Sequence, residues 1–305
     1  MMDDLMTADE VAAYLKINLK SVYHFANHGD IPATRIGNKW LFPKRIIDEW
    51  IFDSAKKNVR SATLDYRDIL LSIGSNDPFW EILSNELIRK PYDTVVPYAS
   101  VGSAEGLRAL GAGKALLAGI HLYDPATDSY NRPFLPQHLS GRRVTLIHLF
   151  NRRQGLMVRG GNPKSIRSVK DLTRSDVSLV NRRQGTGTRQ LLDFYLTNEG
   201  FASDAVRGYD HEVDTHFELA LSILEGKGDA GIGIEIAARY SGLDFIPLKE
   251  ESYDIVLLNE YLNLKPVQVM LDFVKSQRFR KIMEGLPGYD ISDRCSSLWE
   301  GTVGV

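Results

Sequence analysis

The sequence has very little cysteine and no long apolar run, and both absences restrict what the protein can be. Cys295 is the only cysteine among 305 residues, so no disulfide can form within the chain and no Cys/His cluster has zinc-site spacing. The longest apolar runs, such as Ala115–Ile120, are too short to span a bilayer. Met1–Leu5 lacks the basic and apolar regions of a secretory signal. These absences predict a cytoplasmic protein with no membrane partner.

The chain also lacks a strong charge of either sign. Its 37 Lys/Arg and 39 Asp/Glu give a net charge of −2, so the whole molecule is not an electrostatic nucleic-acid binder. Any DNA contact must therefore come from a local patch. The 43% of hydrophobic residues is ordinary for a soluble globular protein, and the length suggests about two domains.

The first sixty residues carry the signals of short helices and a hairpin. Thr7–Glu10 matches a capping box ahead of an apolar helical face. Asn18 is placed to cap a second helix over Leu19–Asn27. Thr34–Phe42 predicts two strands around a tight turn, and Pro43 is placed to open a third helix. Together these elements predict a winged helix-turn-helix.

This stretch resembles the excisionase-type, MerR-like DNA-binding domain over about residues 5–52. The matching segments are Thr7–Ala12, Ser21–Tyr23, Gly29–Ala33 and Arg35–Trp40. The resemblance implies that the second helix enters the major groove of double-stranded DNA and that the hairpin touches the backbone or minor groove. The implied groove residues are Lys20, Ser21, Tyr23 and His24, and the implied backbone or minor-groove residues are Arg35, Asn38, Lys39 and Lys44.

The charge of this module is nearly balanced. Residues 1–60 carry nine Lys/Arg and eight Asp/Glu, so a single copy should bind DNA weakly. A homo-oligomer, a dimer that reads two half-sites, is therefore expected. A solvated helix pair with ordinary surface lysines is the alternative interpretation.

From residue 66 onward, short strands alternate with helices. The predicted strands are Ile69–Ile73, Thr94–Pro97 and Ala115–Ile120, and the predicted helices are Phe79–Ile88 and Ala104–Leu110. This alternation is typical of α/β architecture with parallel sheets. Each early strand ends in a small polar turn at a helix start. Ligands of open α/β sheets bind at that edge, and helix N-termini attract anions.

The most distinctive turn lies in the middle of the chain. A predicted strand, Val177–Val180, leads through Asn181–Arg189 into a predicted helix, Gln190–Asn198. Within the turn, the glycines of Gly185–Thr188 let the backbone approach an oxyanion closely, and the threonines offer hydroxyl groups. The turn has neither the lysine of a Walker A loop nor the third glycine of a GxGxxG motif. A generic anion loop is therefore predicted.

Residues 66–290 resemble the periplasmic-binding-protein-like domain related to molybdate- and tungstate-binding proteins. The matching segments are Val101–Ser103, Gly119–Asp124, Asn181–Arg189, Gly228–Ile234 and Leu286–Asp290. The resemblance implies a two-lobed type II α/β fold with a ligand cleft between the lobes. The implied hinge strands are Val144–Phe150 and Tyr253–Leu258.

Three segments are expected. They are a winged helix-turn-helix over 1–58, a linker over 59–65 and a ligand domain over 66–305. Within the ligand domain, lobe one is expected at about 66–145 and 248–305, and lobe two at about 146–247.

The resemblance also assigns ligand contacts position by position. They are Ser75 and Ser103 from lobe one, Thr186, Gly187, Thr188 and Arg189 from lobe two, and further Thr215 or His216 and Tyr253. The two serines can instead serve as helix N-caps, and Arg189 can instead brace its loop.

The ligand implied by the resemblance is molybdate or tungstate. However, Arg182, Arg183 and Arg189 crowd the same loop, and arginine pairs bidentately with carboxylate or phosphate. A carboxylate-bearing or phosphorylated metabolite is therefore the alternative ligand.

The function predicted is a DNA-binding transcription regulator that senses a small anion and needs no cofactor or resident metal. Ligand binding would close the lobes and change the spacing or orientation of paired DNA-binding heads. No nucleophile elbow or HExxH motif is present, so an enzyme is not expected. A molybdenum-cofactor handling protein and a scaffold that has lost its ligand are the alternatives.

Overall fold

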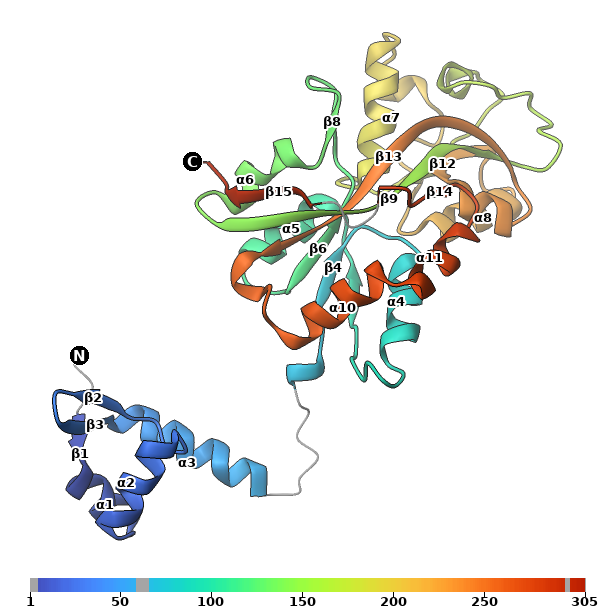
Figure 1. Ribbon diagram of the computed structural model, residues 1–305. Coiled ribbons are helices and arrows are strands. Elements are labelled where there is room, and N and C mark those ends of the chain that lie inside the picture. Colours follow the sequence, from blue (N-terminus) through green and yellow to red (C-terminus); the bar gives the residue numbers. More distant parts are fainter. Residues whose placement is uncertain (1–4, 59–65, 294–296, 305) are drawn as a thin grey trace. The chain divides into compact units, whose positions relative to one another are not determined.

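The computed structural model describes residues 5–58, 66–293 and 297–304. The chain divides into two compact units, Met1–Leu64 and Asp65–Val305 (Figure 1). The linker expected at 59–65 and the lone Cys295 lie outside the described residues. Within the described part of the chain, no helix combines the length and apolar character needed to cross a membrane.

The first unit packs helices against a three-stranded antiparallel sheet. In sheet order the strands are β1 (Leu5–Thr7), β3 (Lys39–Pro43) and β2 (Thr34–Ile36), and the helices are α1 (Ala8–Leu15), α2 (Leu19–His28) and α3 (Lys44–Asn58). Thr7 and Glu10 form the predicted capping box of α1, and Asn18 caps α2 as predicted. Pro43 ends β3 instead of opening the third helix, so that prediction was one residue early. Val22 of α2 and Phe42 of β3 are fully buried in the core of this unit.

The second unit is organised around two long strands (Figure 1). β9 (Arg143–Val158) and β13 (Asp244–Leu258) pair in antiparallel fashion over their whole length. The sheet order is β12-β9-β13-β6-β4-β5, and β14 and β15 also pair with β9. The remaining strands of this sheet are β4 (Ser72–Gly74), β5 (Tyr98–Ser100), β6 (Leu117–Ile120), β12 (Ala230–Ile234), β14 (Tyr289–Asp290) and β15 (Ser297–Thr302).

The pairing partners of β9 and β13 define two lobes. In lobe one, Asp254–Leu257 pairs with β6, and in lobe two, Gln154–Val158 pairs with β12. The chain therefore passes between the lobes twice, near the paired residues Asn151 and Ser252. The hinge segments expected from the sequence are the lobe-one halves of these longer strands, and the expected lobe boundary at residue 146 falls inside β9.

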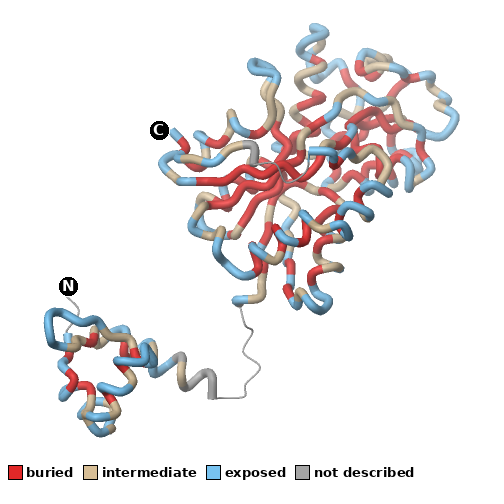
Figure 2. The backbone as a smooth tube through the Cα atoms, in the orientation of Figure 1, coloured by how far each residue is buried: buried red, intermediate tan, exposed pale blue. Residues whose placement is uncertain are grey.

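The helices cover the two halves of this sheet. Lobe one carries α4 (Phe79–Leu87), α5 (Ser103–Gly111), α6 (Leu135–Leu139), α10 (Lys265–Lys275), α11 (Gln277–Glu284) and a hairpin of β7 (Tyr123–Asp124) and β8 (Ser129–Tyr130). Lobe two carries α7 (Gly187–Asn198), α8 (His216–Leu224), α9 (Glu235–Tyr240) and a parallel pair of β10 (Asn181–Arg182) and β11 (Glu212–Val213). Figure 2 shows that buried positions are concentrated along the central strands.

Some strands predicted from apolar runs are displaced. The run Ile69–Ile73 forms a strand only from Ser72, and Ile69 makes a single bridge to Val95. Likewise, regular pairing after Thr94–Pro97 begins at Tyr98, and within the run Val177–Val180 only Leu179 forms a bridge, to Ala230. An apolar run indicates that a segment is buried, whereas a strand also needs a neighbouring strand in register to pair with. A buried apolar segment can therefore lie outside the paired strand.

Candidate functional site

Four helices begin where the two lobes face each other. α4 and α5 follow the parallel strands β4 and β5 of lobe one, and α7 and α8 follow the parallel strands β10 and β11 of lobe two. The lobes touch here, because Arg183 Nη2 donates to the carbonyl of Ser100 at 3.0 Å and the N–H of His216 donates to Asn76 Oδ1 at 3.3 Å. First-turn N–H groups have no partner within their own helix, so this interface favours negative charge.

Arg152, in the middle of β9, is buried and held by two carboxylates. Its Nε donates to Glu251 Oε1 at 2.6 Å, and its Nη1 donates to Asp77 Oδ2 at 2.5 Å. Burial would lower the pKa of Arg152, but the charges of Glu251 and Asp77 outweigh burial and hold that pKa above its usual value. The guanidinium lies 4.8 Å from the ring centroid of Tyr253. Arg152 is therefore a fixed, charged donor.

Arg182, at the end of β10, is equally buried but forms no ion pair with a carboxylate of the described residues. Its Nη2 donates to the carbonyl of Asp214 at 2.7 Å, while Nε and Nη1 have no hydrogen-bond partner. Burial lowers the pKa of Arg182 to about 9, and the charge of Arg152 acts in the same direction. A buried cation without a counterion is costly, so this position suits an anion.

A chain of hydrogen bonds connects β13 to the start of α4. His121 Nδ1 lies 2.7 Å from Glu251 Oε2, and His121 Nε2 lies 2.5 Å from Ser75 Oγ. Gln154 Nε2 donates to the same Glu251 oxygen. Burial alone would raise the pKa of Glu251, but the charges of His121 and Arg152 outweigh it and lower that pKa to about 2. Glu251 is therefore an ionised acceptor at neutral pH.

Buried polar atoms without a partner are concentrated at this interface. Six of the seven such side-chain atoms in the described part of the chain belong to Arg152, Gln154, Arg182, Thr188 and His216. The seventh, Glu235 Oε2, lies 2.9 Å from Arg153 Nε. Buried polar groups are nearly always satisfied in native proteins. Apart from the Gln154 amide oxygen, which accepts, this cluster consists mainly of unpaired donors, so it indicates a place for a polar ligand.

Three residues expected to bind ligand meet at His121. Ser75 Oγ contacts the imidazole as described, and Ser103 Oγ accepts from the N–H of His121 at 3.1 Å. Gly187 begins α7 against the same histidine, and a Cβ there would lie 2.5 Å from its carbonyl oxygen. The adjacent Thr188 is buried with an unpaired hydroxyl. The structure thus brings lobe-one serines and the lobe-two loop together.

Other expected contacts have their hydrogen bonds within the protein. Thr186 Oγ1 caps α7 and donates to Arg183 O at 2.9 Å, and Thr215 Oγ1 caps α8 through the N–H of Glu218 at 3.0 Å. The hydroxyl of Tyr253 donates to Ser75 O at 2.6 Å and accepts from Trp80 Nε1 at 2.8 Å. The hydroxyl groups of these three residues therefore already have partners within the protein.

Arg189 braces the loop, which is the alternative that the sequence left open. Its Nη1 donates to Glu212 Oε1 at 2.6 Å and its Nε to Asp193 Oδ1 at 3.3 Å. The guanidinium also lies 4.0 Å from the ring centroid of Tyr209. All three partners belong to lobe two, so the guanidinium of Arg189 is held within that lobe.

The sequence interpretation did not assign Arg152, His121, Gln154 or Glu251, and it assigned no contact to Arg182. Arg152 and Glu251 are partners because they face each other across β9 and β13 in the register of that pair. The local sequence shows only a polar run, Asn151–Gln154, between the apolar stretches of β9. Among the described residues, no group of His, Cys, Asp or Glu could hold a metal ion.

In the first unit, most of the expected DNA contacts are exposed. Lys20, Tyr23 and His24 lie on the exposed side of α2, and Arg35, Asn38 and Lys39 lie on the exposed hairpin. Two of the expected residues are engaged: Ser21 bonds to Asn18 Oδ1 through its N–H at 2.8 Å, and Lys44 Nζ pairs with Asp48 at 3.1 Å.

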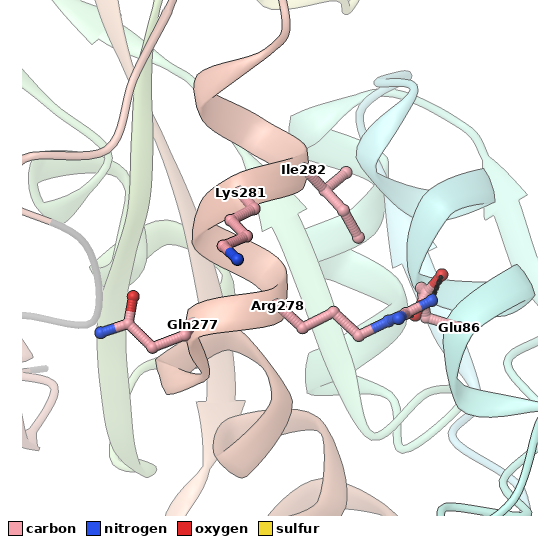
Figure 3. Close-up of a pocket in the computed structure, with 5 residues that line it drawn as sticks. All are labelled: Glu86, Gln277, Arg278, Lys281 and Ile282. Atoms are coloured by element: carbon pink, nitrogen blue, oxygen red, sulfur yellow. Dashed lines mark hydrogen bonds and ion pairs between the residues drawn. The ribbon is translucent and has the colours of Figure 1, made fainter.

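A separate pocket of about 460 Å³ lies between α4 and α11. Figure 3 shows Arg278 extending from α11 toward Glu86 of α4, and the two form an ion pair in which Nη2 lies 2.9 Å from Oε1. None of its lining residues belongs to the cluster of unpaired donors. The donor cluster between the lobes is therefore the stronger candidate site.

Comparisons with known proteins agree with this division of the chain. Residues 84–275 match the model of the PBP superfamily domain, and residues 5–51 match a helix-turn-helix domain. The uncharacterised protein YvgK of Bacillus subtilis (strain 168) is 33% identical over 294 residues, covering 93% of this chain and 94% of YvgK.

Solved structures are similar in fold at low sequence identity. A putative phosphate ABC transporter substrate-binding protein with bound phosphate from Clostridium perfringens is 15% identical, with a TM-score of 0.53 over 71% of this chain and 96% of that one. The sulfate-binding protein SubI of Mycobacterium tuberculosis is 17% identical, with a TM-score of 0.51 over 74% of this chain and 86% of that one. These likenesses support the type II periplasmic-binding-protein fold.

Proposed function

The chain belongs to the PBP superfamily and joins that domain to a helix-turn-helix domain, and from this premise we propose that it is a transcription regulator controlled by a small anion. The anion binds between the lobes of the second unit, and the first unit binds double-stranded DNA. Because the proposed partner is double-stranded DNA, we place the protein in the cytoplasm. Catalysis has no part in this function.

The observation that carries the ligand proposal is the buried, uncompensated guanidinium of Arg182. Its Nε and Nη1 are unpaired, as is Arg152 Nη2. An anion that accepts from both arginines would supply the missing charge and hydrogen bonds at once. Charge-assisted hydrogen bonds of this kind are roughly twice as strong as neutral ones, so ligand binding would hold the two lobes together.

Molybdate or tungstate is the first ligand class, since each presents four oxygens to a small site with donors on several sides. The second class is a carboxylate or phosphorylated metabolite, which two guanidinium groups would favour through bidentate pairing. The similar folds that bind phosphate and sulfate in other proteins are the reason to include both anions in a test.

DNA binding rests on the exposed polar residues of α2 and the hairpin. Lys20, Arg35 and Lys39 are exposed, as phosphate contacts require. A second copy of the chain supplies the second half-site, since one nearly neutral module binds weakly. Anion binding changes the balance between two arrangements of the paired modules, and this change in arrangement alters the affinity for DNA.

The test is a thermal-shift titration of the full chain with molybdate, tungstate, sulfate, phosphate and a panel of carboxylates. A binding anion at a hundredfold excess over Kd should stabilise the protein by about 2.7 kcal/mol. Arg182→Met should abolish that shift. Arg159→Met is the matched control, because Arg159 also lies in lobe two and its Nη2 also donates to a carbonyl, that of Ile223 at 3.1 Å. No shift with any anion would overturn the proposal.

A further inference from the structure

His121 is the one buried side chain that connects a carboxylate to a hydroxyl at the anion site. It is 2% exposed, and its ring lies between Glu251 at 2.7 Å and Ser75 at 2.5 Å. Other charged or titratable groups face it from each side. They are Arg152 of β9, Arg182 of β10, His216 of α8 and Tyr253 of β13, whose ring stacks at 6.0 Å.

The hydrogen-bond network fixes which atoms carry protons. Since Glu251 is ionised and can only accept, His121 Nδ1 carries a hydrogen. Burial lowers the pKa of His121, Glu251 opposes this in part, and the net direction is downward. A neutral His121 has an unprotonated Nε2, which must accept the hydroxyl hydrogen of Ser75. Ser75 Oγ then has only lone pairs left for a ligand.

The charges around the site also indicate that His121 responds to a bound anion. Asp77 and Glu251 pair only with Arg152, so Arg182 is the one guanidinium of the two that offers its positive charge to an anion. A doubly charged oxyanion would therefore bring at least one negative charge that no cation compensates into a buried region, and it would meet the lone pairs of Ser75. A nearby negative charge favours the protonated form of a histidine, so the bound oxyanion itself promotes protonation of His121.

We propose, on the basis of the anion site proposed above, that His121 takes up one proton from solution when a doubly charged oxyanion binds. The proton goes to Nε2, which then donates to Ser75 Oγ. The Ser75 O–H bond is kept and its hydrogen turns to an oxygen of the ligand. No covalent bond is made or broken beyond the new N–H. His121 thereby determines which anions the site accepts.

This coupling has a measurable consequence for selectivity. Affinity for a doubly charged oxyanion should fall about tenfold for each pH unit between the pKa of His121 in the free protein and its higher pKa in the complex, because binding takes up one proton in that range. A singly charged anion brings less uncompensated charge and should show a smaller dependence. The site thus favours doubly charged oxyanions most strongly at lower pH.

The experiment is isothermal titration calorimetry of the full chain with sodium molybdate, repeated in buffers of different ionisation enthalpy. The dependence of the observed heat on the buffer gives the number of protons taken up. We expect about one proton per molybdate, by the linkage between protonation and binding. His121→Gln keeps an N–H donor for Glu251 but cannot take up a proton, so uptake should vanish and affinity should become independent of pH.

A second buried histidine, His148 of β9, gives a matched control. His148 Nδ1 lies 2.9 Å from Asp254 Oδ1 and 2.9 Å from Ser252 Oγ, so it is also buried beside a carboxylate and a hydroxyl. None of these three residues carries one of the unpaired donors. His148→Gln should leave proton uptake unchanged, whatever its effect on stability.

The outcomes separate this inference from the proposed function. If molybdate binds with proton uptake, and the uptake disappears in His121→Gln but not in His148→Gln, the result supports both the anion sensor and the role of His121. Binding without proton uptake by the unaltered chain overturns the inference and leaves the anion sensor intact. Uptake that persists in His121→Gln also overturns it and transfers the proton to another group, such as His216. If neither molybdate nor any other oxyanion binds at any pH, both proposals fail.

Discussion

The two units of this protein use cationic side chains in opposite ways. In the first unit Lys20, Arg35 and Lys39 are exposed, whereas in the second unit Arg152 and Arg182 are buried. Exposed cations attract a polyanion of any sequence and are screened by salt. Buried cations with fixed directions accept only a small anion that fits their donors. Burial, more than residue type, therefore decides what each unit binds.

A finer comparison lies within the second unit, between its two buried arginines. Arg152 is paired with Asp77 and Glu251, and Arg182 is paired with no carboxylate of the described residues. Arg152 therefore has a structural task in addition to any ligand contact, while Arg182 would gain a counterion only from the anion proposed above.

The largest predicted effect follows from this difference. Arg152→Met leaves two carboxylates buried without their partner and should lower the free energy of unfolding by about 3–5 kcal/mol. Arg182→Met removes an uncompensated charge and should change that free energy in anion-free buffer by less than about 1 kcal/mol. Urea denaturation followed by circular dichroism measures both. An equal loss of unfolding free energy in the two variants would contradict the different roles assigned to Arg152 and Arg182.

The next effect sharpens the comparison between the units. Arg35→Ala and Lys39→Ala should each weaken DNA binding and lower the slope of log affinity against log salt by about 1. Lys44→Ala is the control, because Lys44 is engaged with Asp48 and lies 4.8 Å from the ring centroid of Tyr14, so its loss should change the slope less. Fluorescence anisotropy over a salt series gives these slopes.

Neither hairpin variant should change the thermal shift produced by an anion. Loss of the anion-induced thermal shift in a hairpin variant would contradict the assignment of the two ligands to two units. A salt slope of DNA affinity that none of the three substitutions changes would contradict it as well.

The smallest effect separates two neighbouring threonines. The hydroxyl of Thr188 is unpaired, while that of Thr186 caps α7 and donates to Arg183 O. Thr188→Val should weaken anion binding by about 1 kcal/mol without loss of stability, since one hydrogen bond is removed. Thr186→Val should instead lower stability by about 1 kcal/mol, as loss of an N-cap does. Calorimetric titration and urea denaturation of both variants test this assignment, and the reverse pattern would refute it.

Local features of the fold could be predicted, and long-range ones could not. The caps at Thr7 and Asn18 depend on residues within one helical turn, so the sequence was sufficient there. The pairing of Arg152 with Glu251 joins residues 99 positions apart. It depends on the register of β9 against β13, which no local pattern encodes.

The candidate site shows the same division. The loop from Gly185 to Thr188 could be found from its composition, because glycines let the backbone approach an anion closely and threonines at a helix start offer hydroxyl groups. His121 could not be found, since an isolated histidine after a strand has no distinctive spacing. Its importance comes from Glu251 and Ser75, which approach it from two other segments of the chain.

We propose that an anion at the buried arginines controls DNA binding by the first unit. The most direct test is to select binding sites for the full chain from random duplex DNA, then measure affinity for the selected site with and without the stabilising anion. We expect the affinity of the unaltered chain to change about tenfold or more, within the usual range of allosteric coupling, and the affinity of Arg182→Met not to change. Equal affinity with and without the anion in the unaltered chain would contradict it.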